Sequence, residues 1–483
     1  MIYKHTIPTK GIALHSRYNP QQQAERYLDQ QIDETPRTLL LVGAGHGYIV
    51  KEAVKKFPYT KIIALHAVEE PGIESAITWA PSSQLKLDQF LASAVSAYDL
   101  IGLQIIYWQP GCKILKRHHP NYLNAIQNRI SQLQTELVTL GSLGRRYLIN
   151  TVRNMNIHKN STRIMVNKPP LIVAPGPSFD RHAASIKQYR EHITLLCVSS
   201  SLKPLLDYGI TPDIVFAIDA GFYAAELLRP LVRQEYETIP IVAFPQANIP
   251  SQLNNPVFFM GDTRTPEGFL CRHAGRLELT TAAVGTVTAA AMNWALGGDV
   301  LPVAFVGLDL TPSSDKTHCK NHSSTDYIVR NSCRTTPYAT SICHRKKSST
   351  QALQIYREWF TNQAYKLRNQ YGSDQIFVLD GGATSLPVCS LHDYVYSSKS
   401  IKPTLYRSSQ EKTNLSEAVD ILQSDTQGVL GEWRRTGILP HTRSISLDVL
   451  VYSALPNLMQ NNPDQAELSW YTLYEHMKVL ANA

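Results

Sequence analysis

At 483 residues the chain is too long for one hydrophobic core, because cores stop growing near ~250 residues, and the length predicts two or three domains. With 43% hydrophobic and 18% charged residues, the composition excludes a disordered or fibrous protein. The formal net charge of +8 is mild for this length and favours an anionic partner such as a nucleotide or an acidic sugar. No block of like charge marks a nucleic-acid-binding arm.

Cysteine usage and apolar content predict a cytoplasmic protein. The seven cysteines are odd in number and form no CxxC pair, which is typical of reduced thiols. The N-terminal residues lack the apolar core of a signal peptide. The most apolar stretch, residues 282–308, is interrupted by Asn293 and Gly297, which favours a buried helix and a buried strand over a membrane span.

The first part of the chain has the pattern of a β–α–β unit. A β-rich run, a helical periodicity and a second β-rich run follow one another over residues 38–43, 48–57 and 61–68. The connection is short enough for two parallel strands. A mostly helical stretch over residues 121–150 leads away from this unit. We predict an N-terminal Rossmann-like accessory domain over residues 1–150.

The turn of this unit, Gly43 to Gly47, contains three glycines between a strand and a helix. Small residues there let the backbone approach a phosphate at the helix N-terminus. A nucleotide site also needs an acidic residue at the tip of the second strand, where this chain has His66 and reaches Glu69 only later. Two interpretations stay open: a ligand-free Rossmann-like domain and a nucleotide-binding one.

A second α/β pattern follows. Strand-like runs alternate with helical patterns over residues 171–174, 193–198, 214–218, 241–244, 257–260, 303–306 and 376–379. This alternation predicts a doubly wound sheet, whose ligands bind at the carboxyl ends of the strands. We expect this central α/β domain over residues 151–395 and a C-terminal helical region over residues 396–483.

Polar and small residues follow several of these strands. The first strand ends in Gly176, Pro177 and Ser178, where a helix cap and a phosphate cradle are the two interpretations. Further candidates at strand ends or helix starts are Ser200, Ser201, Asp219, Gly285, Thr286 and Asp309. Asp219 suits binding of ribose, an amine or a metal, and a helix-capping aspartate is the alternative. Gly285 and Thr286 are expected in the early turns of a long apolar helix, where an anion meets the positive end of the helix dipole.

One histidine in these motifs is a candidate for acid–base chemistry. His318 lies shortly after Asp309, and a neutral imidazole can accept a hydroxyl proton. His318, Cys319 and His322 also have the spacing of metal ligands, but no fourth ligand is patterned nearby. A surface histidine is the third interpretation. The chain has no P-loop, no Asp-x-Asp pair and no GxSxG nucleophile elbow.

Five short motifs in this order resemble the motility accessory factor (Maf) and archaeal pterin-diphosphokinase (MptE-like) family. They are 174–180 (APGPSFD), 197–221, 285–310, the pair Thr317–His318 and 379–388 (LDGGATSLPV). Together they cover about half of the chain, which is shorter than a typical Maf protein.

The resemblance implies a central domain similar to bacterial sialyltransferases. Such enzymes transfer a nonulosonic acid, of the sialic, pseudaminic or legionaminic type, from its CMP-activated form. In Maf proteins the acceptors are Ser and Thr hydroxyls of flagellin, so the implied role is flagellin glycosylation in motility. No cofactor is required, although Mg²⁺ is compatible with the site. The implied nucleotide-binding and donor-binding residues are Gly176, Pro177, Ser178, Ser200, Ser201, Asp219, Gly285, Thr286 and Asp309.

The resemblance gives two choices for the catalytic base. The sialyltransferase histidine precedes a helix, and the nearest counterpart here is His344, which competes with His318. Two other functions stay open. A 6-hydroxymethyl-dihydropterin diphosphokinase would hold ATP and Mg²⁺ with Asp219 and Asp309, and a non-catalytic protein would only bind flagellin.

Overall fold

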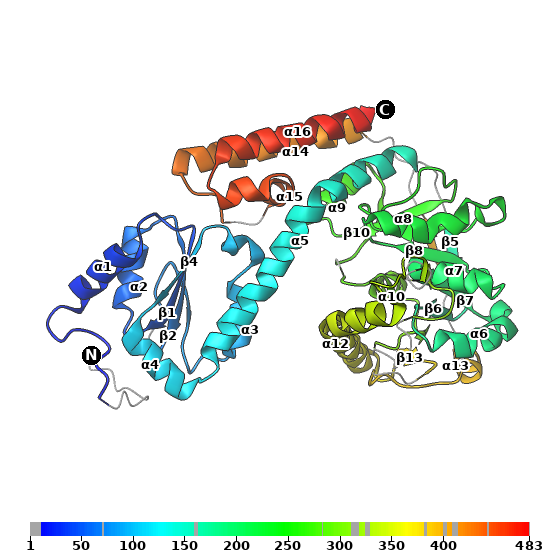
Figure 1. The fold of residues 1–483 in the computed structure, drawn as a ribbon, viewed down its shortest axis with the longest axis horizontal. Coiled ribbons are helices and arrows are strands. Elements are labelled where there is room, and N and C mark those ends of the chain that lie inside the picture. The colour runs from blue at the N-terminus through cyan, green and yellow to red at the C-terminus, as the bar shows by residue number, and fades with distance from the viewer. Residues whose placement is uncertain are drawn as a thin grey trace. The chain divides into compact units, whose positions relative to one another are not determined.

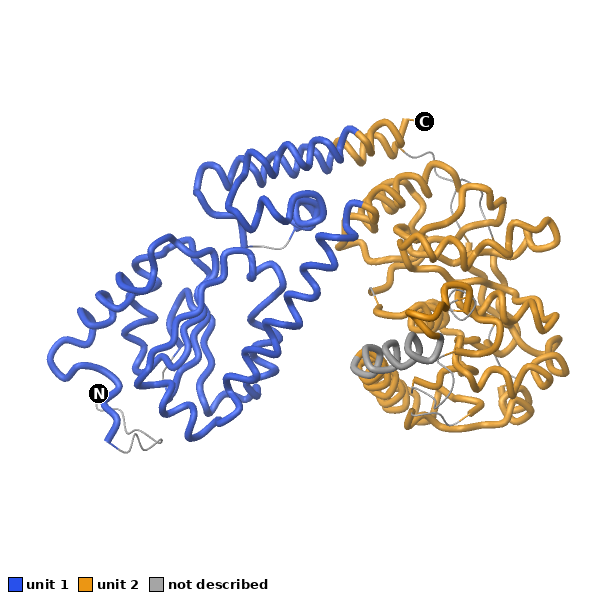
Figure 2. The backbone as a smooth tube through the Cα atoms, viewed as in Figure 1, with its two compact units in different colours: residues 1–145, 421–475 blue, residues 146–420, 476–483 orange. Residues whose placement is uncertain are grey.

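The chain folds into two compact units (Figures 1 and 2). Unit 1 comprises residues 1–145 and 421–475, and unit 2 comprises residues 146–420 and 476–483. The structure is a computed structural model that describes residues 11–69, 72–158, 163–282, 284–310, 318–323, 329–380, 384–398, 403–407, 414–441 and 444–482. For residues 338–351 it describes the helical backbone only.

Unit 1 is built on a four-stranded parallel sheet with strand order β3-β2-β1-β4. All seven residues of β1 are buried, because this strand lies in the middle of the sheet with helices on its faces. The elements are α1 (Pro20–Gln31), β1 (Thr38–Ala44), α2 (Tyr48–Lys56), β2 (Lys61–His66), β3 (Ala76–Trp79), α3 (Leu87–Ala94), η1 (Ala97–Leu100), β4 (Leu103–Tyr107) and α4 (Gln109–His118). The long helix α5 (Tyr122–Ile157) follows and ends in unit 2.

A buried arginine attaches the C-terminal part of the chain to unit 1. The guanidinium of Arg37 donates to the carbonyl oxygens of Tyr98, Leu439 and Pro440. Burial lowers the pKa of Arg37 to about 10, and the nearby Asp99 carboxylate opposes this shift. Arg37 therefore stays charged and supplies donors to the carbonyls of Leu439 and Pro440, while the Tyr98 carbonyl also accepts the Ile101 N–H. The helices of this region are α14 (Leu415–Thr436), α15 (Ile445–Met459) and α16 (Pro463–Asn482).

Unit 2 contains an eight-stranded, fully parallel sheet with strand order β11-β10-β9-β8-β7-β6-β12-β13. The strands are β6 (Pro170–Val173), β7 (Thr194–Val198), β8 (Ile214–Ala217), β9 (Ile241–Ala243), β10 (Val257–Gly261), β11 (Leu277–Thr280), β12 (Val303–Val306) and β13 (Ile376–Val378). The chain winds outward from β6 in one direction and then returns to place β12 and β13 on its other side. The topological switch point therefore lies between β6 and β12, and it is there that ligands bind in open α/β sheets.

Helices flank this sheet (Figure 1). They are α6 (Phe179–Gln188), α7 (Ser199–Asp207), α8 (Phe222–Leu228), α9 (Pro266–His273), α10 (Val287–Gly297), α12 (Tyr338–Tyr371) and α13 (Leu391–Ser397), with the short η2 (Arg190–His192), η3 (Arg229–Val232) and η4 (Gln234–Tyr236). Buried strand and helix residues form one core, in which Trp294 of α10 contacts the rings of Phe216 and Phe258.

A small antiparallel sheet completes unit 2. It pairs β5 (Arg163–Val166) with β14 (Thr404–Arg407). The ring of Tyr406 stacks on Trp294 at 3.9 Å, and its hydroxyl donates to the Trp294 carbonyl at 2.9 Å. This ring and hydrogen bond fix a distant segment of the chain to the helix at the centre of the unit.

The predicted fold class is confirmed, with an N-terminal four-stranded parallel sheet, a central eight-stranded parallel sheet and C-terminal helices. The strand β11 was not predicted, because its run Leu277–Thr280 carries a glutamate that the fold buries beside Arg276. The predicted start of the long apolar helix is wrong, since α10 begins only at Val287. Among the described residues, no helix is long and apolar enough to cross a membrane.

Two glycines of α5 allow it to pack closely in unit 1. A Cβ atom on Gly144 would overlap the ring of Tyr452, and one on Gly141 would overlap the side chain of Leu455. Both partners belong to α15. The two helices can pack this closely because Gly141 and Gly144 have no side chains.

We predict that Gly144→Ala destabilises the protein by ~1–3 kcal/mol through overpacking. Gly431→Ala is the matched control, because Gly431 also lies within a helix but has open space around it. Replacing that glycine should instead stabilise by ~0.5–1 kcal/mol through helix propensity. Chemical denaturation of the two variants measures both effects, and equal stability changes would contradict the packing argument.

Candidate functional site

The ends of β6 and β12 meet in direct backbone contact at the switch point. The Ala174 amide donates to the Val306 carbonyl at 2.8 Å, and the Gly176 amide donates to the Gly307 carbonyl at 2.9 Å. Gly307 has a φ of +72°, and a Cβ atom on Gly176 would overlap the Gly307 carbonyl and the Asp309 carboxylate. Glycine is required at both positions by the fold itself.

Asp309 joins the two strand ends by a further hydrogen bond. Its Oδ2 accepts the backbone N–H of Ser178 at 2.9 Å. Ser178 is the buried N-cap residue of α6, and its side chain makes no capping hydrogen bond. The turn through Pro177 is thus held by backbone and carboxylate contacts, which leaves the start of α6 at the carboxyl edge of the sheet.

The segment carrying His318 docks on the same turn. The Cys319 amide donates to the Pro175 carbonyl at 2.9 Å, and the Lys320 amide donates to both oxygens of Asp180 at 3.1 Å. The His318 ring stacks on His322, with centroids 4.0 Å apart and planes 10° apart. The structure therefore brings His318 next to the turn after β6. In the described part of the chain, no three His, Cys, Asp or Glu side chains are grouped to hold a metal ion.

The predicted residues after β7 and β8 differ in exposure. Ser201 is fully buried in α7, and its Oγ finds no hydrogen-bond partner among the described residues, whereas Ser200 is partly exposed. Asp219 is exposed after β8, and its Oδ1 accepts the Gly221 amide at 2.8 Å. Ser200 and Asp219 are the two that a ligand can reach.

Gly285 and Thr286 precede α10 instead of lying in its first turns. Thr286 is the N-cap residue, and its Oγ1 accepts the Ala289 amide at 3.0 Å. A Cβ atom on Gly285 would lie 3.1 Å from the Tyr356 ring of α12. The side chain of His344 and residue Thr317 lie outside the described residues, as do residues 381–383 of the LDGGATS motif.

Arg357 is a basic residue at this edge that the sequence patterns did not single out. Its Nη2 donates to the Leu310 carbonyl at 3.4 Å, directly after Asp309. Its Nε is buried and has no hydrogen-bond partner among the described residues. The preceding residue, Tyr356, is the one that contacts Gly285. A guanidinium with an unused donor thus lies beside the end of β12 and the approach to α10, and such a group suits a phosphate or carboxylate.

Residues 145–315 match the family described as 6-hydroxymethylpterin diphosphokinase MptE-like. The chain contains an MptE-like domain. Over 332 residues the chain is 26% identical to an uncharacterized protein of Treponema pallidum (strain Nichols), which covers 68% of this chain and 70% of that protein. A second uncharacterized protein of that organism is 26% identical over 221 residues, which is 43% of this chain and 38% of that protein.

The fold extends this similarity to the whole chain. The structure of a Maf glycosyltransferase from Magnetospirillum magneticum AMB-1 matches 100% of this chain and 91% of that one, with a TM-score of 0.51 and 10% sequence identity. At this identity the match establishes the fold. The chain therefore has a Maf-type glycosyltransferase fold that includes an MptE-like domain.

The last turns of α5 hold two loops of the MptE-like domain. Asn154 donates to the carbonyls of Pro245 and Ala247 at 2.8 and 2.7 Å. Arg153 donates to the side-chain oxygen of Asn248 at 2.9 Å. The backbone N–H of Asn248 in turn donates to the Asp219 backbone carbonyl at 2.9 Å. A chain of hydrogen bonds therefore connects α5 to the loop that carries Asp219.

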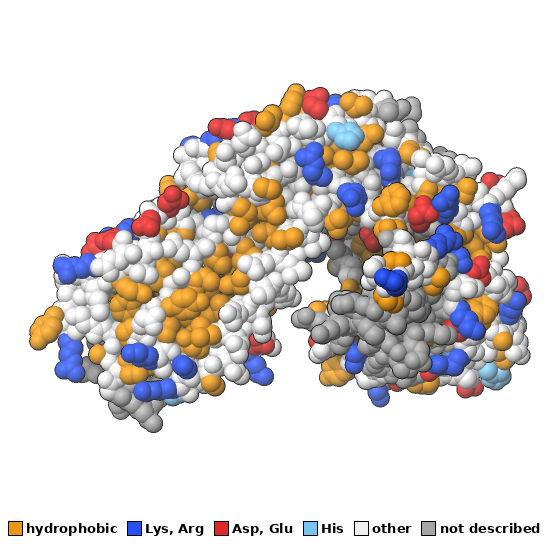
Figure 3. Space-filling model, in the orientation of Figure 1, with side chains coloured by type: hydrophobic (Ala, Val, Ile, Leu, Met, Phe, Trp, Pro, Cys, Tyr) orange, Lys and Arg blue, Asp and Glu red, His pale blue; other side chains and the backbone are white. Residues whose placement is uncertain are grey.

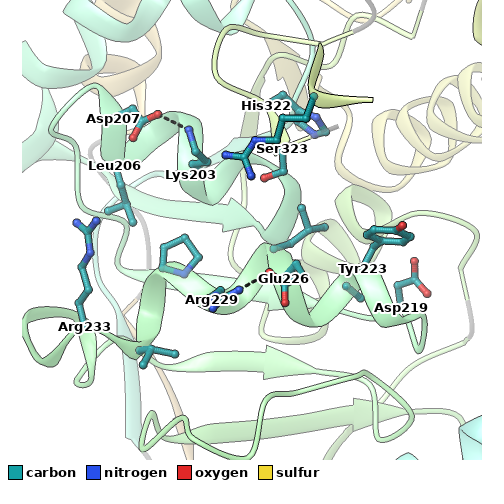
Figure 4. A pocket seen from close by; sticks show the side chains of 15 residues that line it. Lys203, Leu206, Asp207, Asp219, Tyr223, Glu226, Arg229, Arg233, His322 and Ser323 are labelled. Carbon is teal, nitrogen blue, oxygen red and sulfur yellow. Dashed lines mark hydrogen bonds and ion pairs between the residues drawn. The ribbon is translucent and has the colours of Figure 1, made fainter. Parts of the chain in front are cut away.

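A cavity of about 880 Å³ opens beside Asp219 in this domain (Figure 4). Residues of α7 and α8 form its walls, and His322 and Ser323 border it. The cavity is of the size that small-molecule sites have in proteins.

The glycine turn of unit 1 is already occupied by the chain itself. The His46 amide donates to the Nε2 of His15 at 3.1 Å, and a Cβ atom on Gly45 would overlap the same nitrogen. The His15 ring stacks on Trp108 at 5.3 Å. Burial, with a smaller contribution from His46, lowers the pKa of His15 to about 4, so its ring stays neutral and can accept the hydrogen bond. The arrangement supports the ligand-free interpretation of this turn, which stays a prediction.

We predict that Asn154→Ala mobilises the loops at the carboxyl edge of the MptE-like sheet. The variant leaves the buried Pro245 carbonyl without its donor, which costs ~1–3 kcal/mol, while the Ala247 carbonyl keeps the Ile249 N–H. Amide hydrogen exchange should become faster in residues 219–221 and 245–249, because Asn248 joins these loops.

Asn255→Ala is the matched control. Asn255 is buried and donates to two carbonyls, of Tyr236 and Ile239, but these precede β9 at the opposite edge of the sheet. Both variants should lose similar stability, while only Asn154→Ala exposes the Asp219 loop. Equal exchange at this loop in both variants would show that α5 does not hold it.

Proposed function

We propose that the protein is a glycosyltransferase that moves a nonulosonic acid from its CMP-activated form to Ser or Thr hydroxyls of flagellin. The observation that carries the proposal is the meeting of β6 and β12 at the switch point, within a Maf-type fold. Two glycine turns, a helix start and a guanidinium converge there. Backbone N–H groups and an arginine are the donors that a nucleotide phosphate needs.

The proposed reaction is a substitution at the anomeric carbon of the sugar. The acceptor hydroxyl oxygen forms a bond to this carbon, while the bond from the carbon to the CMP phosphate oxygen breaks and its electron pair leaves with CMP. The transition state has oxocarbenium character, by analogy with glycoside hydrolysis. Charge grows on the departing phosphate, so a cation fixed beside it lowers the barrier. Arg357 is placed for that task.

His318 is the proposed general base. The hydroxyl proton passes to its imidazole as the new bond forms, because the alcohol becomes strongly acidic only when it is already bonding. The hydrogen bonds of Cys319 and Lys320 hold this segment on the turn after β6, next to the proposed nucleotide site. His344 is the alternative base.

A pterin diphosphokinase is the second candidate, favoured by the family description of residues 145–315. It would require Asp219 and Asp309 to bind Mg²⁺ with ATP. Each carboxylate already accepts one backbone N–H and has further lone pairs for a metal. Nucleotide preference separates the two candidates directly.

We predict that CMP stabilises the protein against heat and that ATP with Mg²⁺ does not. A ligand present at 100 times its Kd stabilises the native state by ~2.7 kcal/mol. Arg357→Met should weaken CMP binding about tenfold and leave cytidine binding unchanged, because cytidine has no phosphate. Gly176→Val is unsuitable for this test, since the contact with Gly307 requires glycine whether or not a ligand binds.

Arg368→Met is the matched control for Arg357. Arg368 lies on the same helix but is exposed and pairs with Asp374 at 3.6 Å. Its loss should affect neither ligand. A magnesium-dependent shift with ATP alone would support the diphosphokinase, and equal loss of CMP and cytidine would remove Arg357 from the phosphate.

We further predict that His318→Ala abolishes transfer to a co-expressed flagellin while CMP affinity stays normal. Loss of a general base typically costs ~10²–10⁴ in rate and little ground-state binding. His344→Ala is tested alongside, with glycosylated flagellin measured by mass spectrometry. Loss of transfer in His344→Ala alone would assign the base to His344, and normal transfer in both would exclude a histidine base.

A further inference from the structure

Two aromatic side chains are exposed beside Asp219 at the carboxyl edge of the sheet. Phe222 and Tyr223 begin α8 directly after the loop that carries Asp219, and their exposed fractions are 68% and 61%. Their rings contact each other, with centroids 5.7 Å apart and planes 79° apart. Figure 3 shows hydrophobic side chains at the surface over the part of unit 2 that carries α8. Large exposed rings gathered at one place are typical of a site that another molecule covers.

The Asp219 carboxylate lies next to this aromatic pair. Asp219 and Tyr223 line the same end of the cavity (Figure 4). Asp219 is exposed, and its Oδ1 accepts only the Gly221 N–H among the printed contacts of the loop, so the carboxylate has lone pairs for a ligand. A carboxylate near the end of a parallel strand is the group that accepts ribose hydroxyls in many α/β nucleotide sites. An aromatic face beside such a carboxylate suits a nucleoside.

The same cavity connects these groups to the turn after β6. His322 lines the cavity, and its ring stacks on His318, whose segment docks on that turn. The ammonium of Lys203, which also lines the cavity, donates to the Asn321 carbonyl of this segment at 3.3 Å. A ligand in the cavity would therefore border the segment that lies against the proposed phosphate site.

The order of the strands gives the spacing between the phosphate site and the aromatic pair. β6 pairs with β7 and β7 pairs with β8, so the turn after β6 and the loop after β8 are two strand spacings apart, or roughly 10 Å. The phosphate and the base of a nucleoside monophosphate are separated by a comparable length, with the ribose between them. A nucleotide whose phosphate lies at the switch point can therefore reach Asp219 with its ribose and the two rings with its base.

We propose that Phe222 and Tyr223 form the base-binding platform of the nucleotide site and that Asp219 binds the ribose hydroxyls. The proposal rests on the proposed function and adds the base and ribose subsites to its phosphate site. The base stacks on one ring and meets the edge of the other, because the two rings are nearly perpendicular.

Calorimetric titration of the full chain with CMP, cytidine and ribose 5-phosphate tests the platform. Phe222→Ala and Tyr223→Ala should each weaken CMP and cytidine by at least about fivefold, because each removes a ring that contacts the base. Binding of ribose 5-phosphate should stay unchanged, since this ligand has no base. Phe222→Trp should keep CMP binding, because an indole also offers an aromatic face. Both alanine variants should keep the melting temperature of the unliganded protein, since these side chains are exposed.

Asp219→Asn tests the ribose subsite. The side-chain oxygen of Asn can still accept the Gly221 N–H, so the loop should keep its conformation. The variant should bind CMP about tenfold more weakly, because a charged acceptor of the ribose hydroxyls is lost. It should bind dideoxycytidine monophosphate as tightly as the unaltered protein does, since that ligand lacks both hydroxyls. Equal losses for the two ligands would remove Asp219 from the ribose.

Tyr371→Ala is the matched control for the aromatic pair. Tyr371 is 45% exposed, but it ends α12 just before β13 and so lies at the opposite edge of the sheet. If CMP binds but Phe222→Ala and Tyr223→Ala weaken it no more than Tyr371→Ala does, the platform is wrong and the proposed function stands. Failure of the proposed donor gives a different result: ATP with Mg²⁺ would bind in place of CMP, and the two alanine variants would weaken ATP. If no nucleotide binds, both proposals are wrong.

Discussion

The candidate site depends on one backbone contact, between the turn after β6 and the turn after β12. Parallel strands in a sheet are separated by ~4.8 Å, and their ends usually diverge into separate loops. Here the loops stay together, because the Gly176 amide bonds to the Gly307 carbonyl and the Asp309 carboxylate bonds to the Ser178 amide. The His318 segment docks on this joined turn through the Pro175 carbonyl. Loss of the contact would separate the turn after β6 from the turn after β12.

Side-chain amides and guanidinium groups fix the other parts of the molecule in a similar way. Asn154 holds the loop after β9, and Arg37 holds the chain around Leu439 against unit 1. In each case a buried side chain donates to carbonyls of segments that are adjacent in space but distant in sequence. Such contacts need no ligand, so the edge of the sheet is shaped before any substrate arrives. Preorganised donors are what electrostatic catalysis requires, because reorientation during the reaction would cost free energy.

Sequence reasoning located the buried strands of unit 2 because runs such as Leu195–Val198 are apolar throughout, as central parallel strands must be. It failed where a charged residue is buried: Glu278 interrupts the apolar pattern of β11, so this strand was not predicted. Burial raises the pKa of Glu278 to about 8, and the neighbouring Arg276 opposes this shift. The strand-end candidates followed from polar and small residues that come directly after predicted strands, together with the family resemblance. Arg357 has no local signature, since it lies in a long helix and reaches the site only through the packing of α12. The hydrogen bond that His15 accepts in the glycine turn could not be predicted either, because its partner His46 is distant in sequence.

His15 occupies the glycine turn of unit 1, so a free ligand would have to compete with this side chain for the turn. His15 is tethered to its acceptor position by the chain, so it acts as an intramolecular ligand with an effective concentration on the order of millimolar. A nucleotide arriving from solution would have to displace both the hydrogen bond to the His46 amide and the stacking of His15 on Trp108. The turn has the backbone of a binding loop, but its own chain fills it first. In a chain with two α/β units, the glycine turn of unit 1 thus serves as an internal contact of the fold.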